Sequence, residues 1–258
     1  MDALVEVAFG PDPGRWPLPA ATTADELWLR AVAAGGQGRY ASALSDLDRL
    51  ARARPEPVLA SHAFGTRASF ERQLGRHEVA RSWDGRAVAA AGQDVEAAAD
   101  ALIGLAADAL GRGRFALSRQ LLERAADLLG NASGRVAIRL SWVSAELAMC
   151  TGRGSQAVGY AEAAVRAAEG WPSARHAAKS QVVLAAALCG AGDLDAARRV
   201  AQQAWETTER LGLVPLSWAL TCLLHDVGGS SLAAAQIAAA RDAYAATVAH
   251  RGGDWSAR

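Results

Sequence analysis

The residue types that most often perform catalysis or bind metals do not gather into a site in this sequence. The five histidines lie in five separate stretches: His62, His77, His176, His225 and His250. Cys222 and His225 are three residues apart and share a helix face, and Cys189 could join them as a soft metal ligand. The alternative is that these cysteines and Cys150 are small buried apolar residues. We favour that alternative and predict no metal site.

Acidic pairs and glycine-rich runs also have simpler interpretations than catalysis. The pairs Asp46/Asp48, Asp94/Glu96 and Glu206/Glu209 could support acid–base chemistry. Asp94 is better placed to cap a helix that begins at Val95, and we expect the others on solvated faces. No phosphate loop, nucleophile elbow or His-Glu-x-x-His pair occurs. The glycine-rich run 111–115 follows a helix, which predicts an inter-helix turn. We therefore predict no catalytic residue, no cofactor and no enzyme activity, and keep an enzyme built on a helical array only as an alternative.

Composition narrows the class of partner. The 27 basic and 27 acidic residues give a formal net charge of zero, so no overall field draws the chain to nucleic acid or to an anionic membrane. No apolar stretch approaches the roughly 18 residues that span a bilayer, and the N-terminus lacks the basic start of a signal peptide. A cytoplasmic, alanine-rich helical protein of bacterial type is expected, without direct nucleic-acid or membrane contact.

The chain is organised by a repeated turn glycine. Equivalent glycines are Gly38, Gly75, Gly113, Gly152, Gly192 and, more weakly, Gly229, which lie 37, 38, 39, 40 and 37 residues apart. Small residues recur at three offsets from each glycine. They are Ala31, Ala68, Ala106, Ala145, Ala185 and Cys222 seven before; Ala43, Ala80, Ser118, Ala157, Ala197 and Ala234 five after; and Leu50, Ala87, Ala125, Ala164, Ala204 and Arg241 twelve after. Such spacing predicts stacked helical hairpins whose helices cross closely.

This pattern resembles the tetratricopeptide repeat (TPR), a helix–turn–helix unit of about 34 residues. Gly38-Arg39-Tyr40 matches its Gly-x-Tyr turn, Ala43 its small site and Pro55 its closing proline. Phe115 and Leu194 take the Tyr40 position in later repeats, whereas Gly154 and Ser231 depart from it. The resemblance covers roughly residues 24–250 and implies an all-α, right-handed α-solenoid of about six TPR-like hairpins.

Three segments are expected along the chain. Residues 1–21 should form an extended, proline-rich N-terminal arm, because the run from Gly10 to Ala20 holds four of the eight prolines. The TPR-like solenoid should cover residues 22–250, beginning at a capping box of Thr23 and Glu26. Residues 251–258 should be a frayed tail. The arm could pack on the first helices or swap to a neighbour, so a homodimer through the arm or through end-to-end stacking is an open alternative.

The resemblance also implies a groove, because the first helix of each TPR hairpin faces the concave side. Carried over by register, the expected partner-binding residues are Trp28, His62, Arg72, Gln73, Asp100, Arg139, Trp142, Glu146 and Lys179, together with Asp25, Ser69, Ile103, Leu110, Met149 and Val182. The tryptophans could anchor a partner while Arg72, Arg139 and Lys179 address carboxylates or carbonyls. Alternatively the tryptophans fill the core and the cations only solubilise the surface.

These features favour a non-enzymatic scaffold or adaptor that binds a partner protein or peptide through the concave face. The alternative is a ligand- or peptide-sensing module of a bacterial transcription or signalling system. Chaperone-binding TPR domains hold a C-terminal carboxylate with Lys and Asn at set groove positions, and those residues are absent here, so that activity is not expected.

Overall fold

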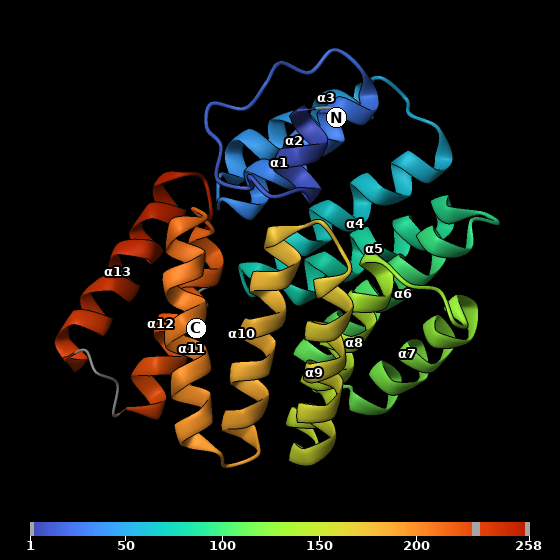
Figure 1. The fold of residues 1–258 in the computed structure, drawn as a ribbon. Helices are drawn as coiled ribbons and strands as arrows, with labels where there is room; N and C mark the ends of the chain where they lie inside the picture. Colours follow the sequence, from blue (N-terminus) through green and yellow to red (C-terminus); the bar gives the residue numbers. More distant parts are fainter. Residues whose placement is uncertain (1–2, 229–232, 256–258) are drawn as a thin grey trace.

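The computed structural model describes residues 3–228 and 233–255, and every regular element in those residues is a helix (Figure 1). The thirteen described helices are α1 (Ala3–Phe9), α2 (Ala24–Gly36), α3 (Tyr40–Arg52), α4 (Pro57–Gln73), α5 (His77–Ala91), α6 (Val95–Gly111), α7 (Phe115–Leu129), α8 (Arg135–Cys150), α9 (Gly154–Glu169), α10 (Ala174–Gly190), α11 (Leu194–Arg210), α12 (Val214–Val227) and α13 (Ala234–His250). From α2 onward they pair as six consecutive hairpins. The predicted all-α repeat fold is confirmed.

The turn glycines are the first cause of this regularity. Five of the predicted glycines adopt the left-handed backbone region that residues with a Cβ rarely enter, with φ between 70° and 88°: Gly38, Gly75, Gly113, Gly152 and Gly192. In each case the next helix begins two residues later. A single residue type therefore reverses the chain at the same point of five hairpins.

Small side chains at the helix crossings are the second cause. In the first five repeats every residue at the three predicted offsets is at most 4% exposed. A methyl group at the crossing lets two helix backbones approach closely, so that each hairpin buries its apolar face against the next. The core is consequently a series of layers that runs the length of the array.

Overpacking one of these crossings gives the first prediction. Ala164 of α9 is fully buried, whereas Ala167 of the same helix is exposed. Ala164→Leu is expected to lower the free energy of unfolding by about 1–3 kcal/mol, because the added carbons have no space between the helices. Ala167→Leu should stay within about 0.5 kcal/mol of wild type. Equilibrium urea denaturation compares the two, and equal losses would argue against close helix crossing at Ala164.

The sixth hairpin departs from the predicted register. Gly229 and Ser231 lie outside the described residues, and the left-handed glycine is Gly228, with φ of 64°. The fully buried small residue of α12 is accordingly Thr221, while Cys222 is half-buried. The predicted anchor was therefore one residue late in this repeat.

The second helix of that hairpin is displaced further. α13 begins six residues after Gly228 instead of two, so four extra residues shift every later position. Ala234 is exposed and Arg241 half-buried, and Ile237 fills the core in place of the predicted small site. A terminal repeat has no further hairpin to cover, which removes the constraint that keeps the other repeats alike.

The N-terminal arm is only partly extended. Residues 3–9 form α1, and its Leu4, Val7 and Ala8 pack against Val32 and other apolar residues of α2. The proline-rich run that follows contains no helix, as predicted. An arm helix was not foreseen because its apolar pattern is only seven residues long, and the contacts with α2 supply most of its stability.

The predicted capping box is confirmed. Thr23 accepts a hydrogen bond from the Glu26 amide, and the Glu26 carboxylate accepts from the Thr22 and Thr23 amides at 2.7 and 2.9 Å. These bonds, the Thr22 amide first, lower the pKa of Glu26 to about 2. They fix the first residue of the repeat array.

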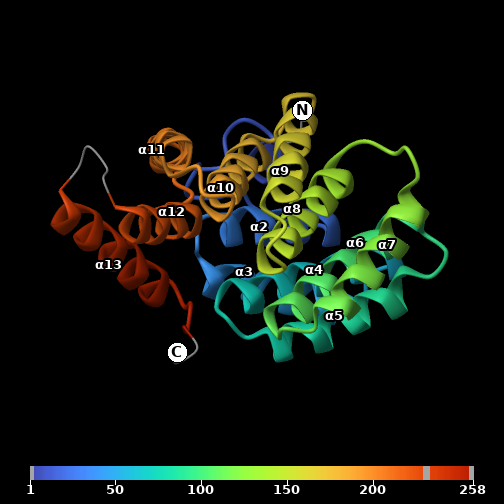
Figure 2. The same cartoon turned by 90° about the horizontal axis from the view of Figure 1, so that it is seen from below.

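The two ends of the array dock on each other. The Ala41 amide donates to the Arg251 carbonyl at 3.0 Å, and the Arg251 guanidinium donates to the Gln37 carbonyl at 2.7 Å. Gly253 is buried against Tyr40. Figure 1 shows α1–α3 lying across the ends of the later helices, and Figure 2 shows the end of α13 approaching α3. The solenoid is thereby closed into a ring.

This docking corrects the expected frayed tail. Residues 251–255 are held by the contacts above and by Trp255, whose ring lies 4.4 Å from that of Trp218; residues 256–258 lie outside the described part. The arm packs on α2, and residues 251–255 dock on the first hairpin. The structure thus gives no support to a homodimer through the arm or through end-to-end stacking.

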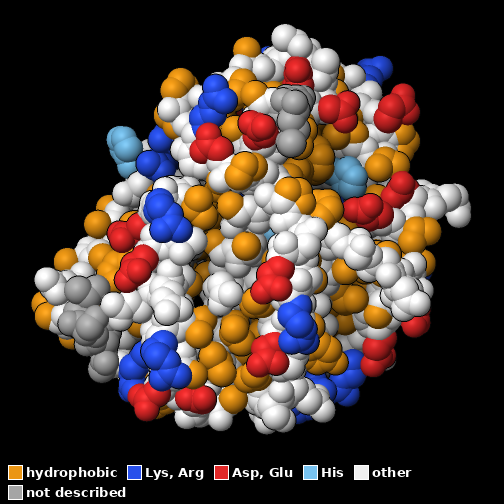
Figure 3. Space-filling view, in the orientation of Figure 1, with side chains coloured by type: hydrophobic (Ala, Val, Ile, Leu, Met, Phe, Trp, Pro, Cys, Tyr) orange, Lys and Arg blue, Asp and Glu red, His pale blue; other side chains and the backbone are white. Residues whose placement is uncertain are grey.

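The face of the molecule drawn in Figure 3 carries no concentrated charge. Figure 3 shows basic and acidic side chains interspersed over one face, as the zero net charge predicts. Within residues 3–228 and 233–255, no helix combines the length and apolar character needed to cross a membrane.

Candidate functional site

The ring surrounds a cavity of about 460 Å³ that is partly open to solvent. Its wall is built by α1, by the first helix of every hairpin, by His77 at the start of α5 and by Trp255. All nine of the principal groove residues predicted from the sequence lie on this wall: Trp28, His62, Arg72, Gln73, Asp100, Arg139, Trp142, Glu146 and Lys179. The structure thus brings them together around one space. Whether they bind a partner remains a prediction.

Among the other predicted groove positions the outcome is mixed. Ser69 and Leu110 line the cavity. Ile103 and Val182 do not, because they point between hairpins into the apolar core and are buried there. Asp25 is exposed, and Met149 packs beside Gly190. These four were misplaced because a helix face turns by 100° per residue, so a small error in register moves a side chain from groove to core.

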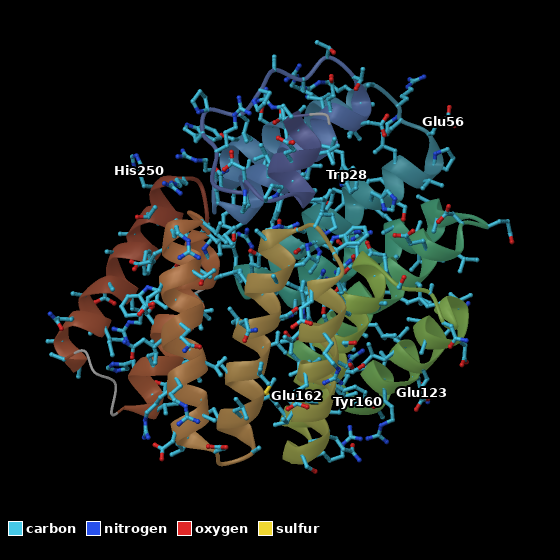
Figure 4. All side chains as sticks on the ribbon, viewed as in Figure 1. Trp28, Glu56, Glu123, Tyr160, Glu162 and His250 are labelled. Atoms are coloured by element: carbon cyan, nitrogen blue, oxygen red, sulfur yellow. The ribbon has the colours of Figure 1, made fainter. Side chains whose placement is uncertain are left out.

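Trp28 combines the two roles that the sequence left open. Its ring stacks on His62 at 5.0 Å between centroids, and its indole nitrogen donates to the Thr66 hydroxyl at 3.0 Å. Figure 4 shows it where α2 faces α4, far from Tyr160 on α9. The side chain is half-buried, so it packs within the wall and still borders the cavity.

Trp142 repeats this arrangement on α8. Its ring stacks on His176 at 5.4 Å, and its indole nitrogen donates to the Ser180 hydroxyl at 2.9 Å. Phe9 of α1 joins the two tryptophan sites, lying 5.5 Å from Trp28 and 6.1 Å from His176. An aromatic band consequently crosses the cavity wall, suited to apolar groups of an occupant.

Arg72 lies on the cavity wall but has a structural role. Its guanidinium on α4 contacts the Asp84 carboxylate of α5 and the Asp108 carboxylate of α6, the latter at 2.9 Å. Gly104 has no side chain, which leaves room for Asp84. Desolvation by burial opposes the charge of Arg72, but Asp84 and Asp108 outweigh it and raise the pKa of Arg72. The predicted binding cation is therefore committed to holding three helices together.

Asp100 on α6 is an acidic residue of the wall that forms ion pairs with two arginines of α8. One oxygen accepts from Arg135 at 2.8 Å and the other contacts Arg139. Lys179 pairs at 3.5 Å with Glu146. The wall thus carries charges of both signs, most of them in ion pairs.

Arg135, Arg175 and His176 are wall residues that the sequence reasoning missed. A signal was present, because Arg135/Arg139 and Arg175/Lys179 are two basic pairs with i, i+4 spacing, and the second pair follows the first by 40 residues (175 − 135 and 179 − 139). That spacing equals the step between Gly152 and Gly192, which places both pairs on equivalent faces.

His176 provides a pH-dependent prediction. Burial, followed by the charges of Arg175, Arg135 and Arg139, holds the pKa of His176 well below its usual value. Between pH 7 and 5.5 the unfolded chain takes up a proton at this residue and the folded chain does not, so stability falls as pH falls, by at most about 1.4 kcal/mol per unit. His176→Gln should show a shallower loss in urea denaturation than wild type. The exposed His250→Gln should keep the wild-type slope, and equal slopes in all three would contradict the assignment.

Other acidic and polar residues near helix ends and crossings have structural roles. Asp94 caps α6 as predicted, accepting from the Ala97 amide at 2.8 Å. Asp46 is not solvated: it is buried and contacts Arg30 at 3.1 Å. At the start of α10, the hydroxyl of the N-cap residue Ser173 lies 2.9 Å from the His176 Nδ1 and makes no hydrogen bond to the backbone of the helix. No cluster of three or more potential metal ligands occurs within the described part of the chain.

Comparison with known proteins supports the fold. No family model matches the chain, and no curated protein matches it in sequence. The crystal structure of Rap protein complexed with competence and sporulation factor is similar in shape, with a TM-score of 0.64 and 14% identity over 90% of this chain and 68% of that chain. At this identity the likeness concerns the fold. The chain is a TPR-like helical repeat protein in architecture.

Proposed function

We propose that this chain is a non-enzymatic sensing module that takes a short peptide, or a molecule of similar size, into the cavity. The observation that carries the proposal is the cavity of about 460 Å³, to whose wall all six hairpins contribute residues. Ligand sites in proteins occupy about 300–1,000 Å³ and combine apolar walls with a few polar groups. The aromatic band and the adjacent ion pairs meet that description.

The contacts between the two ends of the array favour binding of a small molecule or peptide over binding of a folded protein partner. A stable interface with a folded protein buries about 1,600 Å² in total, and an open groove would have to supply it. Here the docking of Gly253 on Tyr40 and of Arg251 on Gln37 and Ala41 joins the ends of the groove. A large partner would have to break these contacts, whereas a small one fits inside.

The wall composition indicates what the occupant resembles. Trp28 and Trp142 present half-buried rings that can pack against apolar side chains. Gln73, an exposed wall residue, is hydrogen-bonded to Tyr40 and Ser69, and its amide keeps capacity for one more donor and one more acceptor. Rap protein, which shares the fold, was solved in complex with competence and sporulation factor. An array of this shape is therefore compatible with ligand binding.

Affinity selection with a random pentapeptide library, read by mass spectrometry, tests the proposal. The wild type should enrich a defined set of peptides, and those peptides should raise its melting temperature. Ala107→Trp places a large ring in the cavity wall and should abolish enrichment. Ala239→Trp, at an exposed position on α13, is the matched control and should retain it.

Circular dichroism must show that both variants remain helical, and Ser69→Trp serves as a second cavity-filling variant if Ala107→Trp does not fold. Wild-type enrichment that persists in the filled variants would place the site elsewhere. An absence of enrichment in the wild type would reject short peptides as ligands.

A further inference from the structure

We infer that Arg135, Arg139 and Arg175 form an anion-binding subsite in the cavity that receives a carboxylate group of the occupant. The inference deepens the proposed function, on which it rests for the existence of an occupant. It names the chemical group that the site recognises and the side chains that recognise it.

The first argument is a charge imbalance in the wall. Three guanidinium groups converge on the cavity, and Asp100 is the one carboxylate, among the described residues, that forms an ion pair with any of them. Glu96 is exposed and acts on Arg135 only through its field. Three positive charges against one negative charge leave a surplus of two.

Neighbouring acids do not remove the surplus. Glu146 is paired with Lys179. Asp84 and Asp108 share the single charge of Arg72, so this triad carries at most one net negative charge and leaves a surplus of at least one positive charge (2 − 1). Burial raises the pKa of Asp84, although Arg72 opposes the shift, which further limits the negative charge that this group can offer. The three guanidinium groups are largely withdrawn from water, since the Arg135 and Arg139 side chains are 13% and 21% exposed. Charges in such positions are normally paired, so the missing counter-ion is expected from outside the chain.

The second argument is the state of Arg175. Its Nε is buried and has no hydrogen-bond acceptor in the described structure. Its aliphatic stem lies against Gly36, where a Cβ would come within 2.9 Å, and its guanidinium lies 6.0 Å from the Phe9 ring. Burial, and then the charge of Arg135, lower the pKa of Arg175 to about 10. A planar fork of donors held at this place without a partner fits a carboxylate.

The N-terminal ends of α8 and α10 add to the positive electrostatic potential of the three arginines. Arg135 is the first residue of α8, Arg175 is the second of α10, and no side chain caps the first turn of either helix. The positive ends of both helix dipoles therefore face the same region. His176 contributes no positive charge at neutral pH because its pKa is held low.

A small aromatic carboxylate tests the subsite independently of any peptide. The probe is 3-phenylpropionate, and its matched neutral control is 3-phenylpropanamide, both measured by calorimetry. The wild type should bind the carboxylate about 10-fold or more tightly than the amide, the difference expected for one charge-assisted hydrogen bond. Arg175→Met keeps the stem but removes the charge and should erase the preference. Arg166→Met, at an exposed position on α9, should keep it.

Stability separates ligand recognition from a structural role. Removing an uncompensated buried charge should leave the melting temperature of ligand-free Arg175→Met equal to or above that of wild type. A lower melting temperature together with wild-type preference for the carboxylate would overturn the inference. So would equal binding of carboxylate and amide, or binding of neither. Arg175→Lys, which keeps the charge, serves if Arg175→Met does not fold, and should retain part of the preference.

The two proposals can fail separately. Enriched pentapeptides combined with no carboxylate preference would reject the subsite and keep the sensing function. A preference for the carboxylate without peptide enrichment would keep the subsite and reject the peptide-sensing function. For enriched peptides, loss of binding on C-terminal amidation assigns the subsite to the chain terminus, and loss on Glu→Gln or Asp→Asn replacement assigns it to an acidic side chain.

Discussion

Arg72→Leu is expected to lower the free energy of unfolding by about 3–5 kcal/mol, the loss typical when one partner of a buried ion pair is removed. The replacement leaves Asp84 and Asp108, whose side chains are 1% and 0% exposed, without a counter-charge. It also breaks the connection between α4, α5 and α6. Equilibrium urea denaturation monitored by circular dichroism measures the loss.

The pH dependence of this loss identifies its cause. In the variant the two buried carboxylates should hold protons to higher pH than in the unfolded chain, so stability is retained at low pH and lost as pH rises through their folded pKa values. The gap between wild type and variant should therefore widen from pH 5 to pH 8. A gap that is constant, or smaller than about 1 kcal/mol, would contradict the buried triad.

Two further variants complete the test. Arg72→Leu/Asp84→Asn/Asp108→Asn removes all three charges and should recover much of the lost stability. Arg166→Leu breaks an exposed pair with Glu162 and should change stability by less than about 1 kcal/mol. Together they separate the cost of an uncompensated charge from the cost of losing any arginine.

Gly252→Ala is expected to open the ring. Gly252 has φ of 86°, and a Cβ there would lie 2.6 Å from the Ala41 Cβ and 2.9 Å from the Ala41 nitrogen. The variant should lose about 1–2 kcal/mol for the left-handed conformation and about 1–3 kcal/mol more for the clash. Faster hydrogen exchange at the Ala41 amide, which donates to the Arg251 carbonyl, should accompany the loss.

Gly192→Ala is the matched control for this experiment. Its φ of 88° is nearly the same, but no atom lies within 4 Å of its added Cβ. It should show the conformational cost alone and leave exchange at Ala41 unchanged. Equal losses in the two variants, with no change at Ala41, would mean that the ends of the array do not hold each other.

Two of the wall residues that were not predicted, Arg135 and Arg175, lie one helical turn from residues that were. Lys179 was predicted as a groove residue and Arg175, four residues before it on the same helix face, was not. The reason is that single positions of the TPR family were matched to this sequence, without their neighbours on the same face. Considering i, i+4 neighbours of each groove residue would have recovered Arg135 and Arg175. Phe9 and Trp255 had no such signal, since they lie outside the repeats.

The sequence by itself determined the first five hairpins, their crossings and most of the side chains that face inward. Turn glycines such as Gly192 and small residues such as Ala197 act within about 40 residues of one another, and local spacing fixes both. Only the tertiary structure decided that the ring closes, that Arg72 is committed to Asp84 and Asp108, and that Arg175 has no carboxylate partner among the described residues. The physical reason is that the curvature of a solenoid accumulates from a small rotation at every repeat, so contacts between its ends depend on the whole array and on no single stretch of sequence.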